Sequence, residues 1–189
     1  MEALDAFLVT FGVIGVAELG DKTQVLAVML AARFRRPLAI LLGILLASVI
    51  SQAIATALGH WLGDAITPSR LRWISGITML VMAAWSLRPS RLEAKDEMRS
   101  TVRFGAFVST AIAFVVAEMG DRTQFATAAL AAHYDSFWAV MLASSLALTI
   151  VAAPMVWIGH YAADRLPLKA MRLGSAAVFA AVGLWILLR

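Results

Sequence analysis

The sequence has no cysteine among its 189 residues, and only 15% of its residues are charged. Without cysteine, a disulfide scaffold, a thiolate zinc site and a cysteine nucleophile are all excluded. Average globular chains are about 25% charged and about 45–50% apolar, whereas this chain is 61% hydrophobic. A soluble domain of this length could not cover so much apolar side chain with so few charges. The composition therefore indicates an integral membrane protein and excludes a disordered, collagen-like or coiled-coil chain.

Apolar segments follow one another along most of the chain. A bilayer crossing needs about 20 apolar residues, and shorter or longer segments adjust by tilting or by thinning the bilayer. The first segment is preceded by Glu2 and Asp5 rather than by basic residues, so we do not expect a cleavable signal peptide. We predict an all-α integral membrane protein with six transmembrane helices, at residues 6–32, 37–60, 73–87, 104–132, 137–160 and 173–188.

The basic residues are distributed unevenly between these segments. Eleven of them fall within 33–36, 88–103 and 161–172, which share one side of the membrane in a six-span topology. The opposite side has only Arg70, Arg72 and Arg189. By the positive-inside rule, we expect both termini to lie outside the cytosol. The lack of a recognisable targeting segment leads us to expect a bacterial inner-membrane protein. The formal net charge of +4 is then a topology signal, so the expected partner is the lipid bilayer and not a nucleic acid.

The chain is an internal duplication with an offset of 100 residues. Between 6–32 and 106–132, 13 of 27 positions are identical. We therefore expect one membrane domain made of a first three-helix repeat at 1–87, a cytoplasmic linker at 88–103 and a second three-helix repeat at 104–189. Because three spans is an odd number, the second repeat enters the membrane in the opposite orientation. Inverted-topology repeats are typical of transporters that work by alternating access, although a duplication can also build a passive helical scaffold.

The most similar stretch of the two repeats lies near the middle of the first span of each. A charge at the bilayer centre costs at least ~2.5–3.5 kcal/mol, and such residues normally face the bundle interior and mark an ion pathway. The two copies read Glu18-Leu-Gly20-Asp21-Lys22-Thr23-Gln24 and Glu118-Met-Gly120-Asp121-Arg122-Thr123-Gln124.

The spacing of this motif predicts a metal site. Residues three positions apart lie along one face of a helix, so we expect the acids and the glutamine of each copy to face the same way. If the two helices cross at the pseudo-two-fold axis, four carboxylates and two amide oxygens converge, which suits a hard divalent cation such as Mg²⁺, Ca²⁺ or Mn²⁺. The predicted metal ligands are Glu18, Asp21, Gln24, Glu118, Asp121 and Gln124.

The other motif positions are predicted to support this site: Gly20, Lys22, Thr23, Gly120, Arg122 and Thr123. The glycines favour either a broken helix or close helix packing. The threonines could be ligands, but we favour hydrogen bonds back to the helix. The two basic residues leave the four acids with a net charge of −2, which one divalent cation or two protons would balance. Alternatively, Lys22 pairs with Glu18 at i, i+4 and merely neutralises it.

Other polar residues in the spans have ordinary interpretations beside the functional ones. Small polar side chains in the second and fifth spans could line the pathway, although helix packing is their commoner role. The histidines lie at span ends, which disfavours a zinc site, and a proton-relay role is less favoured than a plain interfacial one. These residues are Ser48, Ser51, Gln52, Ser144, Ser145 and Thr149, and His60, His133 and His160.

The duplicated E-x-G-D-[KR]-[ST] motif resembles that of a family of small cation exporters. This family contains the bacterial MneA-type manganese exporters and the Golgi Ca²⁺/Mn²⁺–proton exchangers, and the resemblance covers the whole chain. It implies export of a divalent cation from the cytosol, with protons as the suspected counter-ion. It also implies that the ion binds to Glu18, Asp21, Glu118 and Asp121. The bacterial members imply Mn²⁺, whereas the eukaryotic relatives also suggest Ca²⁺.

The sequence therefore predicts a Mn²⁺ exporter, with a Ca²⁺/H⁺ antiporter as the alternative. We expect no enzymatic activity and no cofactor, since the divalent cation is the substrate. An intramembrane hydrolase is the distant alternative, because buried acids can perform general acid–base catalysis. However, the sequence has no Gly-x-Gly-Asp protease element, no activated serine and no phosphate-cradling loop.

Overall fold

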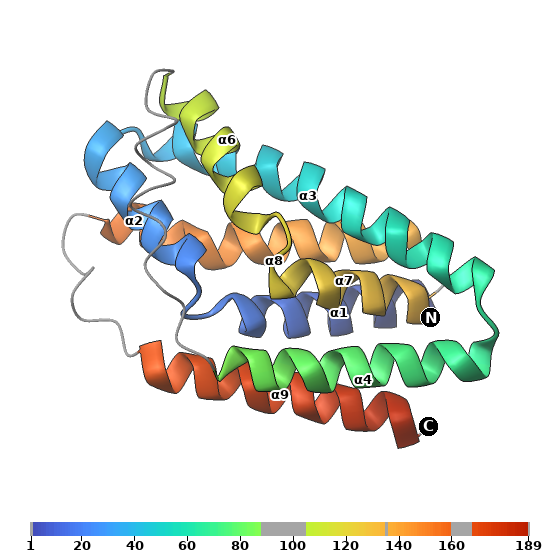
Figure 1. Cartoon of the computed structure of the whole chain (residues 1–189). Coiled ribbons are helices and arrows are strands. Elements are labelled where there is room, and N and C mark those ends of the chain that lie inside the picture. The colour runs from blue at the N-terminus through green and yellow to red at the C-terminus, as the bar shows by residue number, and fades with distance from the viewer. Residues whose placement is uncertain (1, 88–104, 135, 160–167, 189) are drawn as a thin grey trace.

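The computed structural model describes residues 2–87, 105–134, 136–159 and 168–188, and within these ranges every regular element is a helix (Figure 1). The predicted linker at 88–103 and His160 lie outside the described residues. The helices are α1 (Glu2–Glu18), α2 (Lys22–Phe34), α3 (Pro37–Ala65), α4 (Pro68–Ser86), α6 (Ala106–Glu118), α7 (Arg122–His133), α8 (Phe137–Ile158) and α9 (Leu168–Leu188).

The two halves have the same order of helices. The pair α1 and α2 corresponds to α6 and α7, while α3 corresponds to α8 and α4 to α9. The first apolar segment is broken into two helices that bend by 71° at Gly20, where φ is +78°. Our prediction that Glu18, Asp21 and Gln24 share one face of a continuous helix is therefore wrong. A left-handed glycine cannot continue a right-handed helix, so the chain changes direction between the two acids.

Length and apolarity qualify some helices as membrane spans. Within the described residues, α3 and α8 are long and apolar enough to cross a bilayer, and the bent pair of α1 and α2 qualifies as a third span. Shorter apolar helical stretches lie at Arg72–Ala84, Ala106–Glu118 and Ala176–Leu188. The six-span arrangement stays a prediction.

The α3 helix has its apolar side outward and its polar side inward, the reverse of a helix in a soluble protein. Its buried face includes Ser48, Ser51, Gln52 and Thr56. Contiguous exposed apolar surface of this extent marks contact with lipid or a partner. The exposed apolar stripe recurs about every four residues, at Leu38, Leu42, Leu46, Ile50, Ile54, Leu58 and Trp61.

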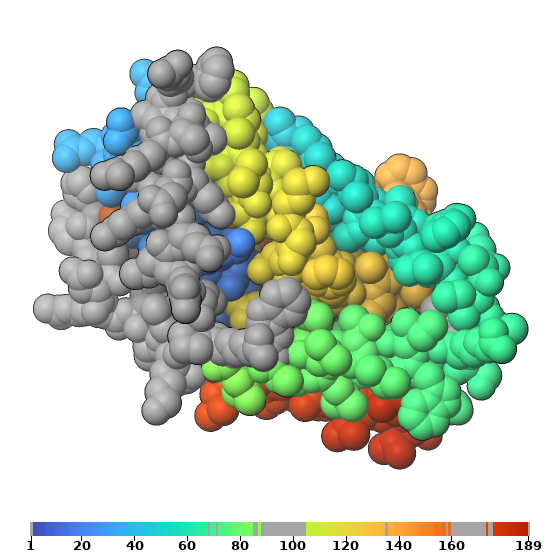
Figure 2. Space-filling view, in the orientation of Figure 1, coloured from blue at the N-terminus to red at the C-terminus, as the bar shows by residue number. Residues whose placement is uncertain are grey.

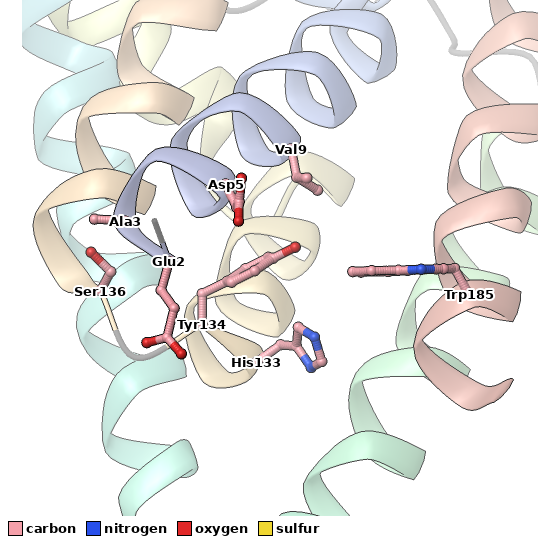
Figure 3. A pocket seen from close by; sticks show the side chains of 8 residues that line it. All are labelled: Glu2, Ala3, Asp5, Val9, His133, Tyr134, Ser136 and Trp185. Carbon is pink, nitrogen blue, oxygen red and sulfur yellow. The ribbon is translucent and has the colours of Figure 1, made fainter. Parts of the chain in front are cut away.

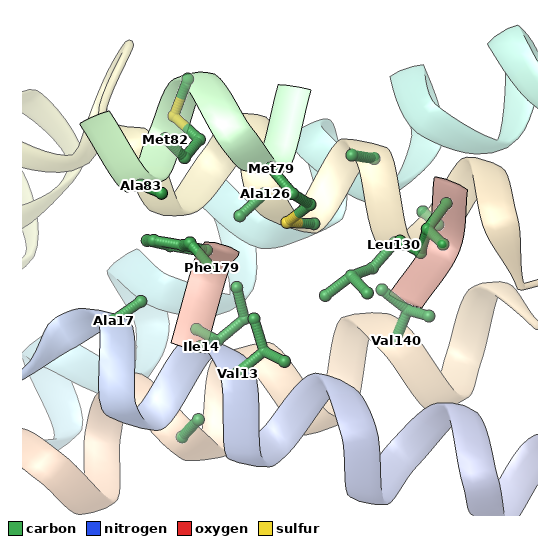
Figure 4. Close-up of a cluster of buried hydrophobic side chains, with 14 of the residues drawn as sticks. Val13, Ile14, Ala17, Met79, Met82, Ala83, Ala126, Leu130, Val140 and Phe179 are labelled. Atoms are coloured by element: carbon green, nitrogen blue, oxygen red, sulfur yellow. The ribbon is translucent and has the colours of Figure 1, made fainter. Parts of the chain in front are cut away.

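Two apolar clusters hold the bundle together. The first joins α1, α4, α7, α8 and α9, with side chains such as Ile14, Met79, Leu130 and Phe179 (Figure 4). The second joins α2, α3, α6 and α8. Both chain termini lie at one end of the bundle, here called the terminal end, while α2 ends and α3 begins at the opposite end (Figure 1). Since α1 runs from the terminal end to the break at Gly20, the residues that it contributes to the first cluster lie between these two points.

The α3 helix packs closely against α6 and α7 through glycine. A Cβ added to Gly59 would lie 2.1 Å from the carbonyl oxygen of Ala128, and one added to Gly43 would lie 2.7 Å from that of Phe107. Since these contacts are with backbone atoms, the helices themselves would have to move apart.

Gly59→Ala is therefore expected to lower the free energy of unfolding by about 1–3 kcal/mol, the range of overpacked cores. Gly12→Ala is the matched control, because a Cβ at Gly12 meets nothing within 4 Å. Alanine should raise the helix stability there by up to about 1 kcal/mol. Thermal unfolding of both variants in detergent measures the difference, and equal shifts would contradict the close packing of α3 on α7.

Candidate metal centre

The two helix breaks have the same local geometry. Gly120 repeats the left-handed conformation of Gly20, with φ at +71°. The N–H of Asp21 donates to the carbonyl of Glu18 at 3.2 Å, and that of Asp121 donates to the carbonyl of Glu118 at 3.0 Å. The duplicated motif thus builds the same turn twice, and each turn places two acids at the ends of two short helices.

The predicted ligands Gln24 and Gln124 stabilise these turns. The Oε1 of Gln24 accepts a hydrogen bond from the N–H of Gly20 at 3.1 Å, and the Oε1 of Gln124 accepts one from Gly120 at 2.9 Å. These N–H groups would otherwise have no helical partner at the break. In this structure the amide oxygens of both glutamines are therefore directed toward the backbone.

The helix ends at the breaks favour the two aspartates and a bound cation. α1 and α6 end at Glu18 and Glu118, so the negative ends of their dipoles lie beside these carboxylates. Asp21 and Asp121 are the N-cap residues of α2 and α7, at the positive ends of those helices. Anions are stabilised at helix N-termini, whereas helix C-termini attract cations.

Three acids from both halves of the chain converge at this point. Glu18, Asp21 and Asp121 can each place one carboxylate oxygen so that all three oxygens lie within 4.8 Å of one another. Glu18 and Asp21 are buried, and Asp121 is half-buried. The buried carboxylate of Glu118 interacts electrostatically with Asp121 and Asp21. These four residues are here called the acid cluster.

The carboxylate of Glu118 accepts a hydrogen bond from α3. The hydroxyl of Ser48 donates to its Oε1 at 3.1 Å. One turn further along α3, the hydroxyl oxygen of Ser51 accepts a hydrogen bond from the Nε2 of Gln124 at 2.5 Å. Sequence reasoning favoured a packing role for these serines, but here they bond to motif side chains.

The threonines of the motif also bond to its acids. The hydroxyl of Thr23 donates to the carboxylate of Glu18, and that of Thr123 donates to Oδ2 of Asp121 at 3.2 Å. We had favoured hydrogen bonds back to the helix, as Thr110 makes to the carbonyl of Ala106. The helix break removes that option, because the residues three and four positions before each threonine lie in the break and not in a helix.

A buried ion pair connects the two halves at the acid cluster. The guanidinium of Arg122 lies 2.6 Å from Oδ1 of Asp21, and both side chains are 4% exposed or less. The corresponding Lys22 is half-buried and forms no ion pair within the described part of the chain. The alternative pairing of Lys22 with Glu18 is not formed, because the break between them removes the i, i+4 relation. Sequence reasoning missed the Arg122 contact, which joins residues 101 positions apart.

The acid cluster retains buried oxygens that have no partner. Among the described residues, Oε2 of Glu18 and Oε2 of Glu118 lack a hydrogen bond. Buried polar atoms are almost always satisfied, so an exception calls for an unseen water or ion. Carboxylate oxygens are the ligands that hard divalent cations prefer. This donor set therefore fits such a cation.

A separate cavity of about 660 Å³ opens at the terminal end, and sequence reasoning did not predict it. Figure 3 shows acidic side chains from the start of α1 facing aromatic ones from α7 and α9. At 1.5 Å per residue, the 13 residues from Asp5 to Glu18 separate it from the acid cluster by about 20 Å. The residues of α1 that belong to the first apolar cluster, from Ala6 to Ala17, lie between them along this helix. The cavity is lined by Glu2, Ala3, Asp5, Val9, His133, Tyr134, Ser136 and Trp185.

Comparison with known proteins identifies the family. Residues 6–94 and 106–189 match the family described as divalent cation/proton antiporter GDT1. The chain belongs to the GDT1 family. It is 36% identical over 177 residues to a Vibrio cholerae protein named "Putative manganese exporter". The aligned region covers 93% of this chain and 87% of that protein.

Two further relatives carry GDT1-like names. A GDT1-like protein of Synechocystis is 30% identical over 198 residues, covering 93% of both chains. GDT1-like protein 3 of Oryza sativa subsp. indica is 29% identical over 188 residues, covering 86% of this chain and 66% of that protein. No solved structure matches the chain.

Membership of the GDT1 family confirms the resemblance predicted from the duplicated motif. The chain is a transporter of the divalent cation/proton antiporter family and not an enzyme. Its all-helical fold and exposed apolar stripe agree with a membrane protein.

Proposed function

We propose that this GDT1 protein exports Mn²⁺ from the cytosol by alternating access, in exchange for protons. The main support for this proposal is that Glu18, Asp21 and Asp121 converge from both halves, with Glu118 beside them. The name of the Vibrio cholerae relative favours Mn²⁺ over Ca²⁺. An all-oxygen donor set suits either ion, so a Ca²⁺/H⁺ antiporter is the alternative outcome of the test below.

In this proposal the ion binds at the acid cluster, between the ends of four short helices. Glu18, Asp21, Glu118 and Asp121 supply carboxylate oxygens, while Gln24 and Gln124 keep the breaks in place. Thr23, Thr123 and Ser48 orient the carboxylates through their hydroxyl donors. Since each half contributes two acids, a movement of one half relative to the other changes the distances between ligands. This is how inverted repeats expose one site to either side in turn.

The proposed topology has six spans in two inverted three-helix repeats, at 1–87 and 104–189. It is supported by the corresponding order of helices in the two halves. The basic segment 33–36 spans the end of α2 and the junction with α3, at the end of the bundle opposite the chain termini (Figure 1). This separation agrees with cytosolic basic loops and with termini outside the cytosol.

A tag fused to the C-terminus is therefore expected to react with a membrane-impermeant label on cells whose outer membrane has been made permeable and whose inner membrane is sealed. The same tag moved to the segment at 88–103 should react only after the inner membrane is opened. The reverse pattern would overturn the proposed orientation.

The proposed substrate is tested by a metal-by-metal transport assay on the purified protein in liposomes. Saturable Mn²⁺ flux, with Ca²⁺ and Mg²⁺ carried more slowly, is the expected result. Faster Ca²⁺ flux would favour the Ca²⁺/H⁺ antiporter. If none of these ions crosses faster than in protein-free liposomes, the proposed function is wrong.

A further inference from the structure

Three buried polar side chains between α3 and α7 have no hydrogen-bond partner within the described part of the chain. They are Gln52 and Thr56 on α3 and Thr127 on α7, each of them 0% exposed. Both amide atoms of Gln52 and both threonine hydroxyls are unsatisfied. Several other buried hydroxyls bond to helix carbonyls, as Ser144 does to Val140 at 2.8 Å, although the hydroxyl of Thr10 on α1 also has no partner among the described residues. Natural interiors rarely leave four such atoms unpaired without a water or an ion.

These side chains continue from the acid cluster toward the terminal end. Ser48, Gln52 and Thr56 follow one another at intervals of four residues, so they share one face of α3. Ser48 bonds to Glu118, while Gly59 on the same face contacts the backbone of α7. Eight residues of helix carry this polar face about 12 Å beyond Ser48. In Figure 1, α3 runs in this direction from the end opposite the termini.

The equivalent helix pair, α8 with α2, has apolar residues at all three corresponding positions. Gln52 and Thr56 correspond to Ala152 and Val156 on α8, and Thr127 corresponds to Ala27 on α2. Those three residues are buried in the second apolar cluster. The same helix pairing can therefore be packed with apolar side chains alone, so helix packing does not require the polar ones between α3 and α7.

The other side of α7 is apolar. In Figure 2, α7 lies between α3 and α4. Toward α4, residues such as Ala126 and Leu130 belong to the first apolar cluster together with Met79 (Figure 4). Water would solvate the polar contact of α7 with α3 far more favourably than its apolar contact with α4. If α7 moves, the side facing α3 is thus the one that opens to water.

We propose that the contact between α3 and α7 is the cation's route between the acid cluster and the terminal end. In the open conformer, the amide oxygen of Gln52 and the hydroxyls of Thr56 and Thr127 replace water ligands as the cation passes. Oxygen ligands of this kind serve hard cations in place of their hydration shell. This inference rests on the proposed function, since it names the path to the same site.

The natural lack of cysteine makes the path directly testable. Thr56→Cys and Thr127→Cys are introduced singly. Val156→Cys on α8 and Ala27→Cys on α2 are the matched controls, at the corresponding positions of the equivalent helix pair. Membrane vesicles of both orientations are treated with a membrane-impermeant thiol reagent, with and without Mn²⁺. Mn²⁺ transport by each variant is measured in parallel.

Thr56→Cys and Thr127→Cys are expected to react from the terminal side, and about tenfold faster when transport is running, since a minor conformer is commonly populated at about 0.1–10%. The two control cysteines should stay unreactive from that side. Reaction of all four cysteines alike, or no reaction of the first two while Mn²⁺ transport continues, would overturn the route. If no variant and no wild-type protein transports a cation, the proposed function fails instead.

A double variant separates the path from a structural role. Thr56→Val with Thr127→Ala removes two unsatisfied hydroxyls, so thermal stability should stay the same or rise. Mn²⁺ export should nevertheless fall about tenfold, if the loss of a hydroxyl–cation contact is taken to cost as much as the loss of one hydrogen bond to a charged group. Unchanged export with higher stability would show that these hydroxyls do not contact the cation.

Discussion

Replacing Glu18 or Glu118 by glutamine is expected to lower divalent-cation export at least 100-fold. Each substitution keeps the size of the side chain but removes a charge from the centre of the proposed site. Changing residues that only support metal ligands already costs about 10–100-fold in metal affinity or activity, so the loss of a charged ligand should cost at least the upper end of that range. Both side chains are 2% exposed or less, which leaves little water to compensate.

The measurement is Mn²⁺ uptake into inverted membrane vesicles, with the amount of protein determined for each variant. Glu2→Gln is the control, since Glu2 is an exposed acid in the cavity at the terminal end. It should transport like the wild type. If Glu18→Gln and Glu118→Gln also transport like the wild type, the acid cluster is not the cation site.

Arg122→Gln is expected to have the largest effect on stability, about 3–5 kcal/mol, the usual cost of removing one partner of a buried ion pair. Arg122 and Asp21 are both almost fully buried, so the variant leaves the Asp21 carboxylate without its counter-charge. A divalent cation at the acid cluster would supply that charge. We therefore expect Mn²⁺ to restore much of the lost stability of this variant.

Lys22→Gln is the matched control, because Lys22 holds the same position in the first copy of the motif but forms no ion pair among the described residues. Its effect on stability should be small. Thermal unfolding with and without Mn²⁺ measures both variants. An equal loss in the two variants, or no rescue of Arg122→Gln by Mn²⁺, would contradict the claim that Arg122 supplies the counter-charge of Asp21 and that a bound cation can replace it.

Much of the candidate site could be predicted from local pattern. The duplication shows that Glu18 and Glu118 occur at equivalent positions, and a charge in mid-membrane is too costly to be incidental. The family follows from the same motif, and the GDT1 match agrees. A break at the motif glycines was one of two options, because glycine permits both a left-handed turn and close packing.

The partners across the bundle could not be predicted, because they depend on contacts between distant segments. The spacing of Lys22 and Glu18 suggested a local ion pair, whereas the structure pairs Arg122 with Asp21 of the other half. The helical face predicted for Gln24 disappears at the break, and its amide oxygen turns to Gly20. The cavity at the terminal end is assembled from α1, α7 and α9, which no single stretch of sequence reveals.

The most direct test of the central claim records metal and pH together inside liposomes that contain the purified protein. A variant with Glu18→Gln, Asp21→Asn, Glu118→Gln and Asp121→Asn is the comparison. For the wild type, we predict that Mn²⁺ enters the lumen while protons leave it. Both signals should be lost in the variant. Mn²⁺ entry at the wild-type rate after all four acids have been neutralised would contradict the account.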